Sequence, residues 1–107
     1  MDQAGRSSSA SEIERQLLAA LCSPGLDDET RTQLFERLAT HKFAAADHET
    51  IFRALLKMRG APPRHIRENL GAGLTRLGFP DIDVEPIFQL EPPSAQQIAA
   101  LLDGLTS

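Results

Sequence analysis

At 107 residues, the chain has the length of one domain with one modest hydrophobic core. Trp and Tyr are absent and Val84 is the only valine, so Leu, Ala and Ile must fill that core and an all-helical protein is expected. The net charge of −4 argues against nucleic-acid binding by the surface as a whole, and the single cysteine, Cys22, excludes an internal disulfide and a cysteine-based metal site.

The first ten residues are small and polar and show no hydrophobic period, so 1–10 are expected to form a disordered lead-in. A single helical domain is expected over 11–107. Its first helix is predicted to begin at Ser11, because Ser11 and Glu14 make an S-x-x-E capping box. Pro24-Gly25 ends this helix, after an apolar face made of Ile13, Leu17, Ala20 and Leu21.

Two more helices are predicted in the following stretch. Asp27 or Asp28 is expected to cap the first of them, whose acidic first turn complements the helix dipole. The second runs from about Asp47 to Arg59, with Asp47 as the cap. Phe43 is placed to fold back beneath its start. The apolar stripes of the two helices are Leu34, Phe35 and Leu38, and then Ile51, Phe52, Leu55, Leu56 and Met58.

A fourth helix is predicted to open at Pro63 or a neighbour and to end at Gly78, with Ile66, Leu70, Leu74 and Leu77 at helical spacing. Gly71 and Gly73 interrupt it at a cost of about 1 kcal/mol each relative to Ala. We therefore expect a kink, a break or a close helix crossing near Gly71–Gly73.

Two short helices complete the predicted order. Asp83 can cap the first of them, with Pro86 in its first turn. The second opens with an S-x-x-Q capping box made by Ser94 and Gln97. Its apolar residues are Ile98, Leu101, Leu102 and Leu105.

The residue types that carry chemistry do not form a recognisable catalytic, cofactor or metal site. His41 and His48 are seven residues apart with a loop and a helix start between them, and His65 lies on another element. We expect His48 to be a first-turn surface or packing residue. The acidic clusters Asp27-Asp28-Glu29 and Asp81/Asp83/Glu85 stand where helices start, which is an ordinary place for acids. No enzyme activity, cofactor or metal is predicted.

A basic run stands out within fifteen residues that contain no Asp or Glu, and it consists of Arg53, Lys57, Arg59, Arg64 and Arg67. Past Arg76 the chain has acidic residues and no Lys or Arg. The basic run is either a solvated face or a docking patch for an acidic partner or for phosphates.

A dense apolar set occupies the proline-interrupted segment near the C-terminus, and it consists of Phe79, Ile82, Val84, Ile87 and Phe88. It either closes the core or forms a surface for self-association or for a partner. In the second case Ile98 and Leu102 of the last helix are predicted to belong to the same surface.

In its order of motifs the chain resembles the N-terminal domain of bacterial DnaB-type replicative DNA helicases. That family has a Glu near the start of a first helix followed by Leu and Ala, as in Ile13–Leu21 here. It then has a Phe ahead of a His-containing helix start and an Ile-Phe pair, matched by Phe43, His48 and Ile51-Phe52. A Pro-Ser step into a last helix is matched by Pro93-Ser94. The similarity covers about 12–105.

The resemblance implies an all-α fold, in which a compact orthogonal bundle of about four helices is followed by a short C-terminal helical hairpin. In the family this domain lacks catalytic residues, pairs with copies of itself and takes part in contacts with primase. The segment from Phe79 to Leu105 corresponds by position to the pairing hairpin. The helicase-binding domain at the C-terminus of bacterial primases is related in fold, so the resemblance is compatible with either side of the helicase–primase contact.

The expected function is therefore a non-catalytic protein–protein interaction domain of DNA replication, with itself and with primase or helicase as partners. The alternative is a small helical nucleic-acid-binding module that uses the basic run 53–67, which covers a helix–turn–helix junction. The acidic net charge argues against direct nucleic-acid binding. Apolar runs are too short to span a bilayer, so no membrane partner is expected. The sequence also lacks the apolar core of a secretory signal, so cytoplasmic localisation is expected.

Overall fold

The computed structural model describes residues 9–106, and the side chains of 10–105. Within this part the chain is all-helical and has no β-strand, as the composition predicts. The radius of gyration is 13.3 Å, which matches the roughly 13 Å of a folded domain of about 100 residues. None of the helices in 9–106 has the length and apolarity to cross a membrane. The helices are α2 (Ser9–Leu21), α3 (Asp28–Ala39), α4 (Ala46–Lys57), α5 (Pro63–Arg76), α6 (Glu85–Gln89) and α7 (Ala95–Thr106).

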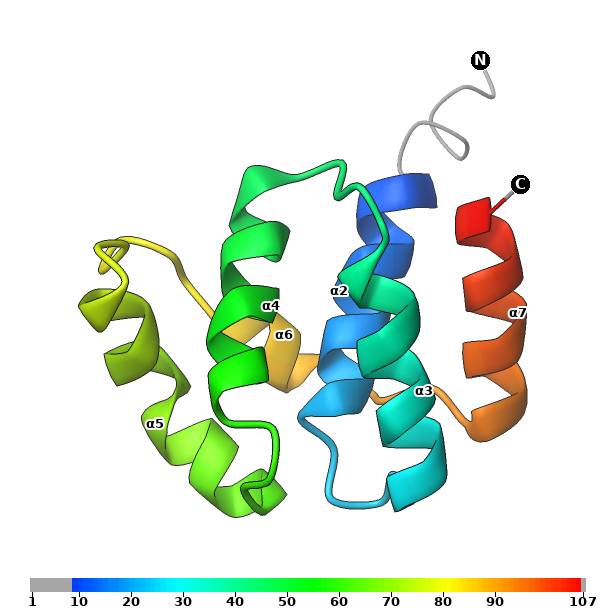
Figure 1. Cartoon of the computed structure of the whole chain (residues 1–107), viewed down its shortest axis with the longest axis horizontal. Helices are drawn as coiled ribbons and strands as arrows, with labels where there is room; N and C mark the ends of the chain where they lie inside the picture. The colour runs from blue at the N-terminus through cyan, green and yellow to red at the C-terminus, as the bar shows by residue number, and fades with distance from the viewer. Residues whose placement is uncertain (1–8, 107) are drawn as a thin grey trace.

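Helix α2 lies at the centre of the molecule. It packs against α3, α4, α6 and α7, while α5 packs on the far side of α4 (Figure 1). The residues of its C-terminal part, Leu17 to Leu21, are all buried, as is Cys22 just after it. A helix that is apolar over most of its circumference needs neighbours on several sides, and this explains why α2 rather than a longer helix takes the central place.

Helix α2 begins earlier than the sequence predicts, and the predicted capping box at its start is wrong. Ser9 and Ala10 are already helical, so Ser11 stands inside the helix rather than at its N-cap. The carboxylate of Glu14 accepts hydrogen bonds from a different part of the chain, described below. The rest of the predicted lead-in, 1–8, lies outside the described residues.

Local capping chemistry is confirmed at two other helix starts. Asp27 is the N-cap of α3, and its carboxylate accepts hydrogen bonds from the Thr30 amide at 3.0 Å and the Thr30 hydroxyl at 2.8 Å. At α7, the Gln97 amide donates to Ser94 Oγ at 3.2 Å and the Ser94 amide donates to Gln97 Oε1 at 2.8 Å. Both ends of the predicted S-x-x-Q box are therefore formed.

The start of α4 differs from the prediction. Its N-cap is Ala45, which has no side chain able to accept a hydrogen bond, and Asp47 stands in the first turn. Pro63 opens α5, as predicted. The short helix α6 is preceded by Asp83, whose Oδ1 accepts a hydrogen bond from the Glu85 amide at 3.0 Å.

Helix α5 runs without a break through both of its internal glycines. At Gly73 it comes close to α4, because a Cβ placed there would lie 3.9 Å from Ala54 Cβ and 3.6 Å from Met58 Cε. Of the three outcomes expected at this point, a break is absent, and at Gly73 the helix packs against α4 at distances that are ordinary van der Waals contact. Gly78 ends the helix with a φ of 94°, and the Phe79 amide donates back to the Leu74 carbonyl at 2.9 Å. This is a glycine-terminated helix end that satisfies a carbonyl of the last turn.

Candidate functional site

The most unusual side chain in the described residues is Glu14, a carboxylate with 0% of its surface exposed. An ionised carboxylate in a core is strongly unfavourable unless donors and positive charge surround it. The sequence places it there because Glu14 stands three, four and seven positions before Leu17, Leu18 and Leu21. It therefore shares the face of α2 that is buried against the other helices.

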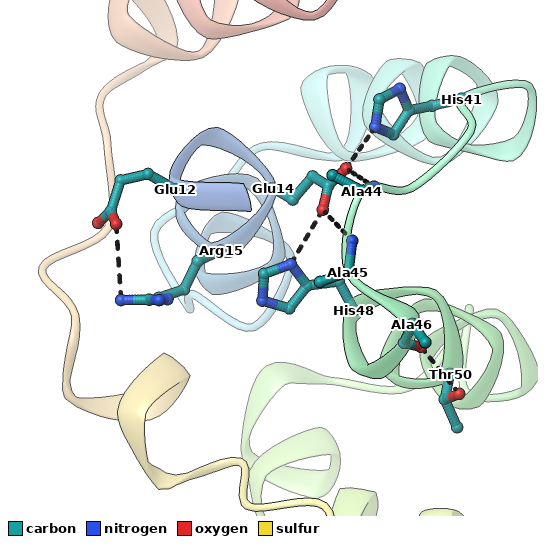
Figure 2. A network of polar contacts seen from close by, with 9 residues as sticks. All are labelled: Glu12, Glu14, Arg15, His41, Ala44, Ala45, Ala46, His48 and Thr50. Carbon is teal, nitrogen blue, oxygen red and sulfur yellow. Dashed lines mark hydrogen bonds and ion pairs between the residues drawn. The ribbon is translucent and has the colours of Figure 1, made fainter. Parts of the chain in front are cut away.

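Four donors converge on the Glu14 carboxylate (Figure 2). Oε2 accepts from His41 Nε2 at 2.7 Å and from the Ala44 amide at 2.7 Å. Oε1 accepts from His48 Nδ1 at 3.0 Å and from the Ala45 amide at 3.4 Å. Both oxygens are thus satisfied by protein groups, and no buried side-chain nitrogen or oxygen in 10–105 lacks a partner. We call Glu14, His41 and His48 the Glu14 cluster.

The Glu14 carboxylate also completes the start of α4. Ala45 is the N-cap of that helix but offers no side-chain acceptor, so backbone amides there need a partner from elsewhere. Glu14 supplies it from α2 through the amides of Ala44 and Ala45. Its negative charge also lies at the positive end of the α4 dipole, which is the favourable orientation.

The pKa of Glu14 reflects this balance. Burial alone would raise the pKa of the carboxyl group above its ordinary value of 4.5. The hydrogen bonds from the Ala44 amide, His48, His41 and the Ala45 amide outweigh burial, and the pKa is held below that value. The carboxylate is therefore charged in the folded protein at neutral pH, and each imidazole nitrogen that faces it carries the proton of the hydrogen bond.

Aromatic rings extend the cluster into the core. The ring of His41 meets Phe43 edge-on at 4.9 Å between centroids, and Phe43 packs on Phe52 of α4 at 5.5 Å. Phe52 in turn meets Phe35 of α3 at 5.9 Å. Phe43 therefore does fold back onto α4, as predicted. The loop between α3 and α4 is fixed by polar contacts to Glu14 and by this row of rings.

Sequence reasoning missed the Glu14 cluster. His48 is a buried packing residue, which is one of the two roles predicted for it, but its bond to Glu14 was not predicted. The available signal was the position of Glu14 on an apolar stripe, since a carboxylate there requires partners. No group of three or more His, Cys, Asp or Glu side chains suited to a metal ion is present among the described residues.

The predicted apolar surface is divided between core and exterior. Ile87, Ile98 and Leu102 are buried, and Ile82, Val84 and Phe88 are half-buried against the core. Phe79 is 44% exposed and is the one large hydrophobic side chain that is exposed among the described residues. Of the predicted set, Phe79 is the member most accessible to a partner.

The five cations of the basic run are all exposed, on α4, α5 and the turn between them. Three of them have intramolecular partners. Arg53 forms a long ion pair of 3.7 Å with Glu49. The guanidinium carbon of Arg59 lies 5.3 Å from the Phe35 ring centroid, and that of Arg67 lies 5.2 Å from the Phe88 ring centroid. Lys57 and Arg64 complete the run at the surface.

Cys22 is a buried thiol near the end of α2. Burial raises its pKa to about 11, against the smaller opposing effects of Arg67 and Arg31. Arg31 also fixes the turn after α2, because it donates to the carbonyls of Leu21 at 3.0 Å and Ser23 at 3.3 Å. A thiol with a raised pKa is a poor nucleophile at neutral pH, so this arrangement is a packing feature.

Comparison of the chain with known protein families, with curated proteins and with solved structures gave no match.

Proposed function

We propose that this chain is a protein–protein interaction domain of DNA replication, similar in role to the N-terminal domain of DnaB-type helicases. It would act without catalysis, by associating with copies of itself and by contacting primase or helicase. In this proposal the helical bundle is a rigid support, and the segment from Phe79 to Leu105 corresponds to the pairing hairpin of the family.

The observation that carries the proposal is that the residues on which the resemblance depends are in direct contact with one another. The Glu of the first helix and the His of the later helix start are hydrogen bonded to each other, as Glu14 and His48 at 3.0 Å. The Phe ahead of that helix and the Phe of the Ile-Phe pair are packed ring against ring, as Phe43 and Phe52. The residues that carry the resemblance therefore belong to one contact cluster in this chain.

In this proposal, the segment that would correspond to the pairing hairpin is packed against α2 rather than standing apart from the bundle. Helix α7 packs along α2, with Ile98 and Leu102 turned into the core. A partner would therefore meet the exposed side of this region, where Phe79 is the large apolar side chain available. Aromatic side chains that become buried on binding commonly contribute most of the affinity at an interface.

The proposal is tested by measuring the solution mass of the chain and its binding to the primase and helicase of the same cell. Phe79→Asp is expected to weaken these interactions by about 30-fold, the effect of losing about 2 kcal/mol from one aromatic anchor. Gln33→Asp adds the same charge at an exposed position of α3 and serves as the matched control. Equal binding by both variants would remove Phe79 from the interface.

Nucleic-acid binding by the basic run is the second candidate, favoured by the exposure of all five cations across α4, α5 and the turn between them. Arg64→Ala combined with Arg67→Ala would then abolish salt-dependent DNA binding. No binding at low salt, where phosphate contacts are strongest, would exclude this function.

A further inference from the structure

A basic groove of about 350 Å³ lies between the end of α3 and the last turns of α7. It is lined by Arg37, Thr40, His41, Lys42, Leu102 and Leu105. Arg37 and Lys42 are exposed, whereas Leu102 is buried and Leu105 half-buried. The groove therefore has an apolar floor and a cationic rim, a combination suited to an acidic segment that also carries apolar side chains.

The chain contains one such segment, the acidic loop from Phe79 to Glu85. Its carboxylates Asp81, Asp83 and Glu85 are exposed, and they alternate with the half-buried Ile82 and Val84. Phe79 projects at its start with 44% of its surface exposed. The loop and the groove thus carry opposite charges, and the exposed Phe79 and the half-buried Leu105 are the apolar side chains most accessible to the contact.

The two features cannot meet within one molecule. Figure 1 shows the loop after α5 at one end of the longest axis and α7 at the other, and that axis measures 39 Å. A contact between them therefore requires two copies of the chain. Since the two surfaces differ, the contact is head-to-tail, and a bound pair still presents one open groove on one copy and one open loop on the other.

We propose that the acidic loop Phe79–Glu85 of one copy docks into the groove formed by Arg37, Lys42, Leu102 and Leu105 of the next. This inference deepens the self-association in the proposed function and rests on it. The attraction between exposed charges is screened over about 10 Å at 0.1 M salt and about 3 Å at 1 M, so assembly is favoured at low ionic strength.

The test uses sedimentation equilibrium of the full chain with two variants. The groove variant, Arg37→Glu with Lys42→Glu, reverses the rim. The loop variant, Asp81→Ser with Asp83→Ser, removes charge but keeps a side-chain acceptor for the Glu85 amide at position 83. The association constant of each variant alone is expected to be at least about tenfold lower than that of the original chain.

A mixture of the two variants gives the decisive readout. The intact loop of the groove variant can enter the intact groove of the loop variant, whereas the reverse contact joins a neutral loop to an acidic groove. An equimolar mixture is therefore expected to form a dimer that grows no further. Arg53→Glu with Lys57→Glu, which makes the same charge change on α4, is the matched control and is expected to assemble like the original chain.

Association that persists unchanged in the groove or loop variant would overturn this docking while leaving self-association intact. A mixture that stays monomeric, or that grows as far as the original chain, would also overturn it. A monomeric original chain that still binds primase would remove the head-to-tail contact and the self-association, and would leave the proposed contact with primase in place. A monomeric chain that binds neither primase nor helicase would remove the proposed function as well.

Discussion

The carboxylate of Glu14 joins residues that stand between 27 and 34 positions away in the chain, from His41 to His48. The four donors around this buried carboxylate depend on it, because each of them loses its acceptor if the carboxylate is removed. The Glu14 cluster therefore fixes the loop between α3 and α4 and the direction in which α4 leaves it.

Glu14→Ala is predicted to lower the free energy of unfolding by about 3 kcal/mol, since it leaves the buried His48 without its acceptor and removes the acceptor of His41 and of two amides at the half-buried start of α4. Urea denaturation measures this loss. Glu12→Ala is the control on the same helix, where Glu12 forms only a partly exposed ion pair of 3.7 Å with Arg15. Its expected effect is below about 1 kcal/mol. Similar losses in the two variants would mean that the buried hydrogen bonds contribute little.

The lowered pKa of Glu14 predicts a pH dependence of stability. Because its pKa is lower in the folded state than the ordinary 4.5, the unfolded chain takes up the proton first as the pH falls. The stabilisation is fully present above the unfolded value and is lost as the pH falls through the folded value.

The pH effect is isolated by comparing the original chain with Glu14→Ala, because other carboxyl groups also titrate in acid. Asp27, for example, has a pKa lowered chiefly by the hydrogen bond from the Thr30 amide. The difference in unfolding free energy between the two proteins is expected to be constant near neutral pH and to shrink below about pH 4.5. A difference that stays constant through the acid range would contradict the assigned charge state.

At the residue scale, the sequence identifies Glu14 and His48 as residues of interest but does not predict that they are hydrogen bonded to each other. Glu14 fits an S-x-x-E pattern, yet its side chain is turned inward because its neighbours on the α2 face are buried leucines. A capping pattern reports on local hydrogen bonds only, and here contacts with residues distant in the sequence replace the local ones.

At the scale of single elements, two glycines, one inside α5 and one just after it, are predicted to change stability in opposite directions when replaced by alanine. Gly71 is exposed within the helix, and a Cβ there would meet nothing within 4 Å. Gly71→Ala should therefore raise the free energy of unfolding by about 0.5–1 kcal/mol through helix propensity. Gly78 has a φ of 94°, which other residues rarely adopt, so Gly78→Ala should lower it by about 1 kcal/mol or more.

Thermal or urea unfolding of the two variants provides the check. Because both are single Gly→Ala substitutions, each serves as the control for the other. A stabilising Gly78→Ala would mean that the end of α5 does not have the left-handed backbone described. A destabilising Gly71→Ala would mean that this face of α5 is covered by another surface in solution.

Helix positions were predictable where the signals are local. Asp27 and the Ser94–Gln97 pair define helix starts through hydrogen bonds within a few residues, and Pro63 and Gly78 define helix ends through their own backbone preferences; each is found at its predicted position. Asp47 failed as a cap of α4 because the amides at that helix start are bonded to Glu14 of α2. When an acceptor from another helix takes the place of a local cap, the sequence around the helix start does not indicate it.

At the scale of the whole molecule, composition predicted the helical class, because the chain has one valine and many helix-forming Leu and Ala residues. The packing of the helices depends on which apolar faces meet, and periodicity within one helix does not specify its neighbour. The predicted apolar surface illustrates this limit. Ile98 and Leu102 have helical spacing that suits either a core or an interface, and they face α2 in the core.

The proposed replication role belongs to this scale too, since it concerns what the whole surface meets. Phe79, the acidic loop and the basic groove are the features through which the molecule would recognise another. Buried residues such as Glu14 and His48 contribute to recognition only by holding these surfaces in place.

The most direct test of the account is sedimentation velocity of the unmodified chain at low salt, alone and mixed with the primase or the helicase of the same cell. The account predicts a mass that rises with concentration and a distinct faster species in the presence of primase or helicase. A sedimentation coefficient that stays at the monomer value at every concentration, with no complex in either mixture, would contradict it.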